Sequence, residues 1–286
     1  MTTVTVLGLG AMGLPMATWL ATKMTARGFD VSAERVALAA AAGVIGCATA
    51  AEACQGADVV VIGVRDGRQL NDALDAAVAG MAPGTVVLLT STVGADAART
   101  AAARLAGHDV ALVDAPVSGG ALRAGKGDLL IMASGTPYDL AKVDGVLHTL
   151  GSTVVVAGAA VGDGQNLKTV NQLLAGVHIA AANEALALAH ALGLELGPLI
   201  DVLNSGAAAS FMFADRGPRI AQQLNGETPP LRSRLDVIDK DMRIVAELAH
   251  SAGVETPVAL AAGELYQRAM AAGLAASDDS VVATIL

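Results

Sequence analysis

The sequence predicts a doubly wound α/β sheet over residues 1–161, followed by an all-α domain over residues 162–286. Three observations support this prediction. Short apolar runs alternate with Ala-rich helical patterns in the first part, a G-x-G-x-x-G spacing follows the first run, and strand-like runs disappear after Gly162. Strands that alternate with helices of this length are typical of repeated βαβ units and a parallel sheet.

Five short runs are expected to form the strands of this sheet. Each is almost entirely apolar, as in parallel strands that helices cover on both faces. They are VTVLGLG from Val4, TARGFD from Thr25, ADVVVIGV from Ala57, TVVLLTS from Thr85 and VALVDAPV from Val110. Beyond Val110, LLIMASG and STVVVAG lie closer together and are candidates to extend the same sheet.

Helical patterns connect these runs and fill the second half of the chain. SAERVALAAAAG has Ser32 in the position of an N-cap and Gly43 just past its end, residue types that favour helix boundaries. A long apolar, Ala-rich helix is predicted from Gly162, and four further helical patterns follow it. The Gly-rich stretch from Ala157 to Asp163 is not periodic, and it therefore marks the expected domain boundary.

The composition limits the classes of partner and site. The chain has 286 residues, a formal net charge of −9 and a pI near 4.9. Nucleic acids and anionic membranes attract basic surfaces, so neither is expected as a partner. Cys47 and Cys54 are too few for a disulfide framework and lack metal-ligand spacing, so no metal site is predicted.

The first 22 residues contain no charged side chain, which superficially resembles an export or membrane segment. However, no basic residue precedes the apolar run, and Gly8, Gly10, Gly13 and Pro15 interrupt it. The sequence therefore predicts a cytoplasmic protein.

The residues after the first predicted strand form a candidate dinucleotide-binding loop. In the G-x-G-x-x-G spacing, the first glycine allows a tight turn, the second lets a diphosphate approach the backbone, and the third lets the helix pack on the strand. The N-terminus of the following helix offers free N–H groups to the diphosphate. The candidate cofactor-binding residues of this loop are Gly8, Leu9, Gly10, Ala11, Met12 and Gly13.

Asp30 ends the second predicted strand, 20 residues after Gly10. A carboxylate at this place accepts hydrogen bonds from the ribose of NAD, and it repels the 2′-phosphate of NADP. NAD is therefore the favoured cofactor. NADP is retained as an alternative, because Arg27 and Arg35 lie near Asp30 in the sequence.

Ser118, Gly119 and Gly120 follow the strand candidate that begins at Val110. Their backbone N–H groups and one hydroxyl form a suitable nest for a carboxylate. On a later helix, Lys240 lies between two aspartates. This spacing alone fits an ion-paired surface lysine as well as it fits a lysine of the functional site.

Lys168 lies near the start of the long apolar helix, and Asn171 and Gln172 follow one turn later on the same face. A lysine on an otherwise buried helix is costly unless it is paired or lines a cavity. Partial removal from water favours its neutral form, which can accept a proton as hydride chemistry on an alcohol requires. Lys168 is therefore the candidate general acid/base.

Four motifs together resemble the β-hydroxyacid dehydrogenase family, which includes 3-hydroxyisobutyrate dehydrogenase, tartronate semialdehyde reductase and 6-phosphogluconate dehydrogenase. They are GLGAMGLPMA, DAPVSGG, GDGQNLKTVNQ and the late KDM, in family order across nearly the whole chain. KTVNQLLAGVHIAAANEALALA and VSGGALRAGKGDLLIMASG look closest to the L-threonate dehydrogenase branch. The resemblance implies an N-terminal Rossmann domain, a long interdomain helix and an all-helical C-terminal domain.

The resemblance also implies roles for individual residues. It assigns catalysis to Lys168 and substrate anchoring to Asn171 and the Ser118–Gly120 segment. It gives Lys240 a place near both the nicotinamide and the substrate carboxylate, and it gives Thr92 a contact with the cofactor. The expected reaction is hydride transfer between NAD(P) and a small hydroxyacid.

Two other functions remain as alternatives at this stage. An imine reductase could use the same scaffold, although Lys168 counts against it because imine reductases of this scaffold lack the helix lysine. A non-catalytic dinucleotide-binding scaffold is the second alternative. The Ala-rich helix and the helical second half further predict a homodimer or homotetramer.

Overall fold

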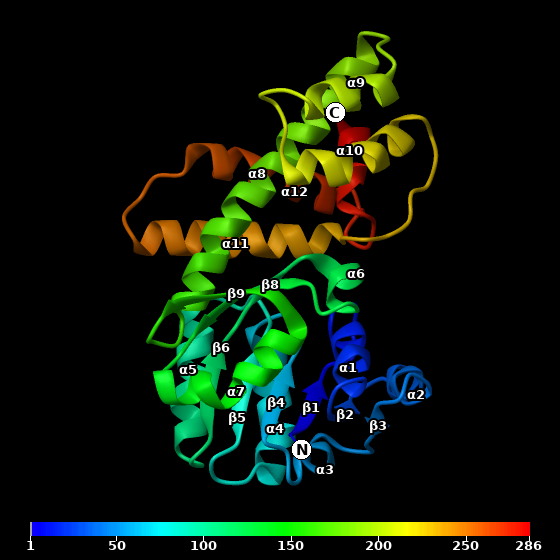
Figure 1. Cartoon of the computed structure of the whole chain (residues 1–286). Helices are drawn as coiled ribbons and strands as arrows, with labels where there is room; N and C mark the ends of the chain where they lie inside the picture. The colour runs from blue at the N-terminus through cyan, green and yellow to red at the C-terminus, as the bar shows by residue number, and fades with distance from the viewer. Residues whose placement is uncertain (1) are drawn as a thin grey trace. The chain divides into compact units, whose positions relative to one another are not determined.

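The computed structural model describes residues 2–286 and contains two compact units, one that ends at Lys168 and one that runs from Thr169 to Leu286 (Figure 1). The first unit is an α/β sheet with helices on both faces, and the second is helical. The predicted fold class is confirmed. We keep residues 1–161 and 162–286 as the proposed domains, although the start of the long helix, from Asp163 to Lys168, lies in the first compact unit.

The first unit is built on one nine-stranded sheet, in the order β3-β2-β1-β4-β5-β6-β8-β7, with β9 paired to β8. The first six of these strands are parallel, whereas β8 runs antiparallel to β6 and β7. The strands are β1 (Thr3–Leu7), β2 (Thr25–Phe29), β3 (Ile45–Gly46), β4 (Val59–Ile62), β5 (Val86–Leu89), β6 (Ala111–Asp114), β7 (Val117–Ser118), β8 (Leu129–Ser134) and β9 (Gly151–Gly158). All seven runs expected from the sequence form strands of this sheet, and the two after Val110 extend it as β8 and β9.

The strand order reverses between β1 and β4. The chain proceeds outward from β1 to β2 and β3, then returns to place β4 on the other side of β1. Leu7 is level with Phe29 on one side and with Ile62 on the other, so the carboxyl ends of these three strands lie together. In doubly wound sheets, ligands bind outside the carboxyl ends of the strands at such a reversal.

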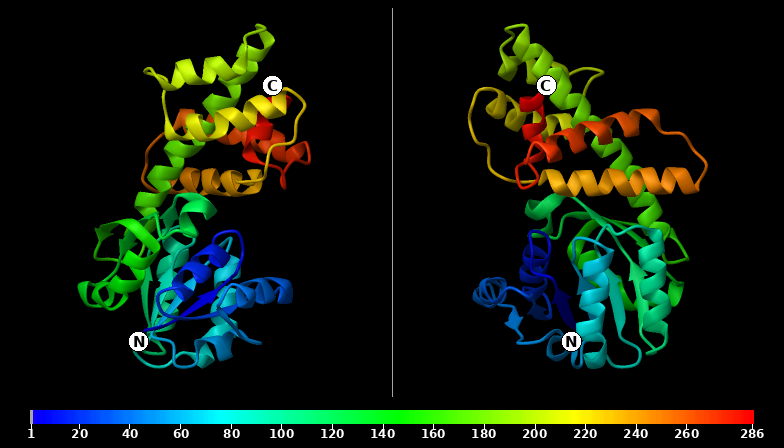
Figure 2. Two further views of the ribbon diagram at one scale, coloured as in Figure 1. Left: turned by 45° about the vertical axis from the view of Figure 1, so that its right-hand side comes forward. Right: turned by 180° about the vertical axis from the view of Figure 1, so that it is seen from behind.

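Helices cover both faces of the sheet, as Figures 1 and 2 show. One core lies between the sheet and the side chains of α1, α2 and α7, and the other between the sheet and those of α3, α4 and α5. Both are packed mainly from Val, Leu, Ile and Ala, as expected for a chain with 2% aromatic residues. The helices are α1 (Gly13–Ala21), α2 (Ala33–Ala41), α3 (Ala50–Cys54), α4 (Gly67–Ala77), η1 (Val78–Gly80), α5 (Ala95–Ala106), α6 (Gly120–Ala124) and α7 (Pro137–Leu150).

Local chemistry fixes where several of these helices begin. The Ser32 hydroxyl accepts a hydrogen bond from Arg35 N at 3.4 Å, and the Asp66 carboxylate accepts one from Gln69 N at 2.8 Å. Each satisfies an N–H group that has no partner within its own helix. Gly43, just past α2, has a φ of +91°, a conformation that favours glycine. The helix boundaries expected at Ser32 and Gly43 are thus confirmed.

The second unit contains most of the long helix and four further α-helices. These elements are α8 (Asp163–Ala191), α9 (Leu196–Asn204), α10 (Phe211–Leu224), α11 (Leu235–Ser251), α12 (Pro257–Ala271) and η2 (Asp279–Ile285). The helix α11 crosses α8 (Figure 1). A Cβ on Gly176 of α8 would lie 2.2 Å from Met242 Sδ of α11. The fully buried Tyr266 donates its hydroxyl to the Gly176 carbonyl at 2.5 Å, so α12 is fixed to the same turn of α8.

A buried ion network connects α10 to the start of η2 in this unit. Arg219 Nε donates to Asp278 at 3.0 Å, and Arg216 Nη2 donates to Asp279 at 3.0 Å. Both carboxylates are almost completely buried, and Asp278 also accepts hydrogen bonds from the backbone of Arg232 and Ser233. Buried charges are tolerated when they are paired in this way, so α10 and η2 are held together by their side-chain charges.

Within residues 2–286, α8 is the one helix that is long and apolar enough to cross a membrane by length and composition. Its most apolar 18-residue window has a mean hydropathy of 1.3, and 44% of that window is buried in the structure. A helix in the interior of a protein meets the same criterion, so this helix is weak evidence for a membrane span.

Candidate functional site

The glycine loop lies at the reversal of strand order. Gly8 has a φ of +89°, and a Cβ there would lie 2.2 Å from the carbonyl oxygen of Gly63, which follows β4. A Cβ on Gly13 would lie 1.7 Å from Gly8 O. Around Gly10, by contrast, there is nothing within 4 Å of the Cβ position. The loop is therefore closed toward the sheet and open at Gly10, where a diphosphate needs to approach the backbone. These residues fit a dinucleotide.

The other residues of the loop have different environments. The side chain of Leu9 is fully buried in the core, and its N–H donates to Asp30 at 2.7 Å. Ala11 is exposed and Met12 is half-buried, and both precede the first residue of α1. The first N–H groups of a helix have no partner within it and are available to an anion. The backbone of this segment is therefore the part suited to bind a diphosphate.

Asp30 lies at the carboxyl end of β2, next to the glycine loop. One carboxylate oxygen accepts from Leu9 N at 2.7 Å, and the other accepts from Ser32 N at 2.8 Å. These bonds fix the orientation of the carboxylate, while each oxygen keeps a further acceptor position. Asp30 is thus placed beside the loop as the NAD prediction requires.

The loop that contains Thr92 follows β5 and is fixed on both sides of that residue. The Ser91 hydroxyl accepts from Val64 N at 2.7 Å, which connects this loop to the one after β4. The N–H groups of Val93 and Gly94 both donate to Gln165 Oε1, at 2.9 and 3.0 Å. Thr92 therefore lies in a rigid segment at the carboxyl edge of the sheet.

The predicted carboxylate nest begins in β7. Ser118 ends that strand, while Gly119 and Gly120 have φ values of +137° and +72°, so both positions favour glycine. At the end of the helix α6 that follows, a Cβ on Gly125 would lie 3.5 Å from the Pro15 side chain of α1. The end of α6 therefore packs against the first turn of α1, which follows the glycine loop.

Lys168 is on the second turn of α8 and is only 6% exposed. Three residues before it, the fully buried Gln165 bonds to the Thr92 loop and to Asp114. Burial raises the pKa of the Asp114 carboxyl, although hydrogen bonds from Gln165, Gly162 and Ser134 act in the opposite direction. The glycine loop, Asp30, Thr92, the Ser118–Gly120 segment and Lys168 all belong to the first unit.

Asn171 and Lys240 belong to the second unit. Asn171 is half-buried and lies one turn after Lys168 on α8, so the two side chains share a helix face. Lys240, on α11, pairs with Asp241 at 2.8 Å, and Asp241 also accepts a 2.5 Å hydrogen bond from Gln172 of α8. Within this unit, Asp241 thus connects Lys240 to the residue next to Asn171.

Sequence reasoning missed Gly63, Ser91, Asp114, Gln165 and Asp241 as parts of the candidate site. Asp114, Gln165 and Asp241 were inside the quoted motifs. For Asp114 and Gln165, polarity in apolar surroundings was the available signal. Their importance comes from contacts between positions 51 residues apart, which spacing along the chain does not show.

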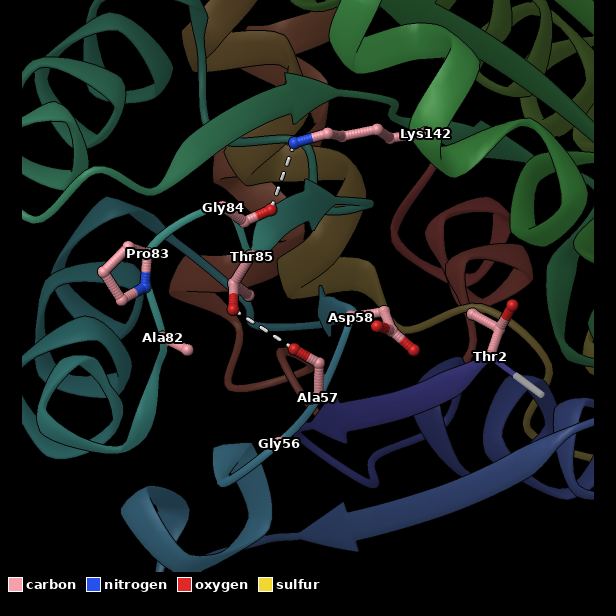
Figure 3. Close-up of a pocket in the computed structure, with 9 residues that line it drawn as sticks. All are labelled: Thr2, Gly56, Ala57, Asp58, Ala82, Pro83, Gly84, Thr85 and Lys142. Atoms are coloured by element: carbon pink, nitrogen blue, oxygen red, sulfur yellow. Dashed lines mark hydrogen bonds between the residues drawn. The ribbon is translucent and has the colours of Figure 1, made fainter.

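A pocket of the first unit lies elsewhere (Figure 3). It has a volume of about 610 Å³, and its lining includes Thr2, Asp58, Thr85 and Lys142. The first three precede β1, β4 and β5, so the pocket is at the amino edge of the sheet, opposite to the glycine loop. It therefore does not correspond to the dinucleotide site.

Comparison with known proteins identifies the family. Residues 3–158 match the model of the NAD-binding domain of 6-phosphogluconate dehydrogenase, and residues 162–286 match the model described as the NAD-binding region of NADP-dependent 3-hydroxyisobutyrate dehydrogenase. The chain belongs to this dehydrogenase family. The predicted resemblance is confirmed, and the protein is an NAD(P)-binding oxidoreductase.

Relatives of the family match over nearly the full length. L-threonate dehydrogenase from Cupriavidus necator is 38% identical, with 98% of this chain and 94% of that protein covered. NAD-dependent L-serine dehydrogenase from Pseudomonas aeruginosa is 32% identical, with 96% of this chain and 95% of that protein covered. The crystal structure of 3-hydroxyisobutyrate dehydrogenase from Salmonella typhimurium is 35% identical, with a TM-score of 0.93 and full coverage of both chains.

Imine reductases also occur among the similar structures. The four compared are 18–24% identical to this chain, with TM-scores of 0.63–0.67. At this level of identity, the similarity shows that these imine reductases share the fold of this chain, and it shows nothing about a shared activity.

Proposed function

We propose that this protein oxidises a small hydroxyacid with NAD⁺ and that Lys168 acts as the general acid/base. The observation that supports this most strongly is the place of Lys168. Lys168 is 6% exposed, and it lies one turn after Gln165, which is bonded to the loop that contains Thr92. An amine in this position belongs to the nucleotide-binding unit and is largely removed from water.

The mechanism assigns one task to each group. Bound NAD⁺ would supply the hydride acceptor, held by the backbone of the glycine loop with Asp30 at the ribose. Neutral Lys168 removes the proton from the substrate hydroxyl, and in the reverse reaction its protonated form returns that proton. Ser118, the N–H groups of Gly119 and Gly120, and Asn171 hold the substrate in the orientation that hydride transfer needs.

We assign Lys240 to the substrate carboxylate and the nicotinamide end of the cofactor. Its ammonium group already pairs with Asp241, which also binds Gln172. The carboxylate of Asp241 therefore holds Lys240 in one orientation and partly offsets its charge. A substrate acid would interact with an oriented cation rather than with a freely moving lysine.

NAD is the proposed cofactor in preference to NADP. Asp30 has its carboxylate fixed beside the glycine loop by Leu9 N and Ser32 N. A 2′-phosphate at the ribose would meet this negative charge, whereas a 2′-hydroxyl would donate a hydrogen bond to it.

The proposed substrates are short hydroxyacids such as threonate, glycerate and 3-hydroxyisobutyrate. The support is the name of the C. necator relative, an L-threonate dehydrogenase that matches over 98% of this chain. The P. aeruginosa relative, named for L-serine, adds a β-hydroxy amino acid to the candidates.

We further propose a cytoplasmic homodimer or homotetramer that has neither nucleic acid nor membrane as a partner. The net charge of −9 supports the exclusion of anionic partners. Exposed apolar side chains at Val170, Leu174 and Leu188 on α8 support association between copies of the chain.

The test of the catalytic role compares two lysines of the same unit. Lys168→Ala should lower kcat by about 10²- to 10⁴-fold, the range of general acid–base catalysis, while NADH affinity stays near the wild-type value. Lys142→Ala, at the amino edge of the sheet, should leave both unchanged. Near wild-type turnover by Lys168→Ala would remove Lys168 from the mechanism.

The same assay distinguishes the alternatives. Wild-type protein is offered threonate, glycerate, 3-hydroxyisobutyrate and L-serine with NAD⁺, and a cyclic imine with NADH and NADPH. Oxidation of one acid supports the proposal, and reduction of the imine alone would replace it with an imine reductase. NADH binding without turnover of any compound would indicate a non-catalytic scaffold.

A further inference from the structure

The carboxamide of Gln165 uses its full hydrogen-bonding capacity inside the first unit. Its Oε1 accepts from Val93 N at 2.9 Å and from Gly94 N at 3.0 Å. Its Nε2 donates to Ser91 O at 2.9 Å and to Asp114 Oδ1 at 2.7 Å. A side-chain amide has two donor and two acceptor positions, and all four are occupied here. The side chain is fully buried, and its two bonds to Ser91 and Asp114 are buried with it.

Asp114 binds the start of α8 from the end of β6. Its Oδ2 accepts from Gln165 N at 2.9 Å and from Gly162 N at 3.2 Å. Ser134 accepts from Gly164 N at 2.9 Å and donates to the same carboxylate at 3.3 Å. The N–H groups that a helix leaves unsatisfied at its start are thus bound by residues far away in the sequence. A carboxylate at this end also interacts favourably with the helix dipole.

The start of α8 has little freedom to move on the sheet. A Cβ on Gly164 would lie 2.4 Å from the carbonyl oxygen of Met132 in β8 and 3.0 Å from Asp114. The helix backbone therefore packs directly on the strand. Lys168 lies four residues after Gly164, about 6 Å further along the helix axis, so its place follows from the place of this turn.

Three segments of the candidate site meet at this one pair of side chains. Gln165 bonds to the residues on both sides of Thr92. Asp114 is the first residue of the segment that leads to the Ser118–Gly120 nest. Both of them bind the helix turn that precedes Lys168. The pair thus connects the cofactor loop, the substrate nest and the proposed acid/base.

We propose that Gln165 is a positioning residue, anchored by Asp114, that sets the distance between Lys168 and the cofactor loop at Thr92. This inference rests on the proposed role of Lys168, and it adds a requirement for the amide at position 165. An apolar side chain there would remove the partner of the half-buried N–H groups of Val93 and Gly94 and of the buried carbonyl of Ser91. A carboxylate would face Asp114 at the 2.7 Å of the present bond.

The experiment uses four variants of the whole protein. Gln165→Leu keeps the approximate volume and removes all four hydrogen bonds. In Gln165→Glu, the new carboxylate faces the carboxylate of Asp114. In Asp114→Asn, the new N–H₂ group faces the N–H₂ group of Gln165. The double variant Asp114→Asn/Gln165→Glu restores a donor opposite an acceptor, although the carbonyl of Ser91 stays unmatched. The readouts are kcat, the pH profile of kcat, and NADH affinity by fluorescence.

Gln165→Leu should lower kcat by about 10- to 100-fold, since a misplacement of 1 Å costs on that order. It should also shift the pH profile of kcat and weaken NADH binding several-fold. The double variant should exceed Gln165→Glu in kcat by about tenfold, because only the double variant has a matched pair at these positions.

Leu70→Ala is the control for a general loss of stability. Leu70 is 1% exposed in the same unit, on the face opposite α1, and none of the bonds above involves it. Its variant should melt at a lower temperature with kcat per folded molecule unchanged. If Gln165→Leu behaves like this control in kcat, pH profile and NADH affinity, the positioning role is wrong. If Lys168→Ala keeps its turnover, the proposed function fails instead, and NADH affinity across the four variants still tests the connection to the Thr92 loop.

Discussion

Gly13 packs against Gly8 so closely that a Cβ at position 13 would lie 1.7 Å from the Gly8 carbonyl oxygen. The first turn of α1 therefore approaches the end of β1 at backbone distance. Gly10, between them, has no atom within 4 Å of its Cβ position. The same short loop thus contains one glycine required by packing and one that leaves room for a ligand.

This contrast predicts opposite results for two alanine substitutions. Gly13→Ala should cost about 3 kcal/mol of unfolding free energy, because backbone must move to admit the methyl group. Gly10→Ala should leave stability nearly unchanged but weaken NADH binding by about tenfold, which corresponds to 1.4 kcal/mol. Urea unfolding and NADH fluorescence titration measure the two effects. An unchanged NADH affinity in Gly10→Ala would place the diphosphate elsewhere.

Asp30 is predicted to set the choice of cofactor. Asp30→Asn keeps an acceptor oxygen for Leu9 N but removes the negative charge. The ratio of kcat/KM for NADP to that for NAD should therefore rise by about tenfold, a change of 1.4 kcal/mol. Asp30→Ala removes the acceptor as well and should also weaken NAD binding. A wild-type enzyme that already prefers NADP would contradict this account of Asp30.

Both cysteines should be unreactive in the folded protein. Burial raises the pKa of the Cys54 thiol to about 12, and burial also raises the pKa of Cys47. Since the thiolate is the reactive form, a disulfide reagent at pH 8 should modify neither thiol at an appreciable rate. The same reagent should titrate two thiols in denaturant. Rapid modification of one thiol in the native protein would contradict the burial of these side chains.

Asp278 should make the second unit sensitive to acid. Burial raises the pKa of its carboxyl, but the hydrogen bonds from Arg232, Ser233, Ser280 and Arg219 outweigh burial and hold that pKa below its usual range. A lowered pKa in the folded state means that ionised Asp278 stabilises the protein above the unfolded value of about 3.9. This contribution is lost as the pH falls through the folded value.

The measurement for Asp278 compares the wild type with Asp278→Asn in urea unfolding across pH. At pH 7 the variant should be less stable by about 1–3 kcal/mol, the worth of hydrogen bonds to a charged group. The difference should shrink as the pH is lowered from about 5 toward 2. A difference that stays constant over this range would show that the charge of Asp278 does not stabilise the fold.

The sequence was sufficient for the main elements because their patterns are local. VTVLGLG and ADVVVIGV are continuous apolar runs, and they became the adjacent parallel strands β1 and β4. By contrast, β3 consists of Ile45 and Gly46 only, both exposed, and it exists because β2 offers an edge to pair with. No periodicity can develop in two residues, so this strand could not be predicted.

The candidate site was predictable where chemistry requires a residue type at a fixed spacing. The three glycines and Asp30 are of this kind, and the structure places them around one loop. The partnership of Asp114 with Gln165 is different, because it depends on strand β6 ending beside the start of α8. Such contacts between distant segments are decided by the tertiary structure, and local pattern does not encode them.

The ion network of the second unit has a consequence for synthesis. Arg216 and Arg219 find their opposite charges at Asp278 and Asp279, more than 55 residues further along the chain. A guanidinium group buried without its counter-charge is strongly unfavourable. The helical unit therefore cannot complete its interior while those aspartates are still inside the ribosome exit tunnel, whereas the first unit, which ends at Lys168, is free to fold during translation.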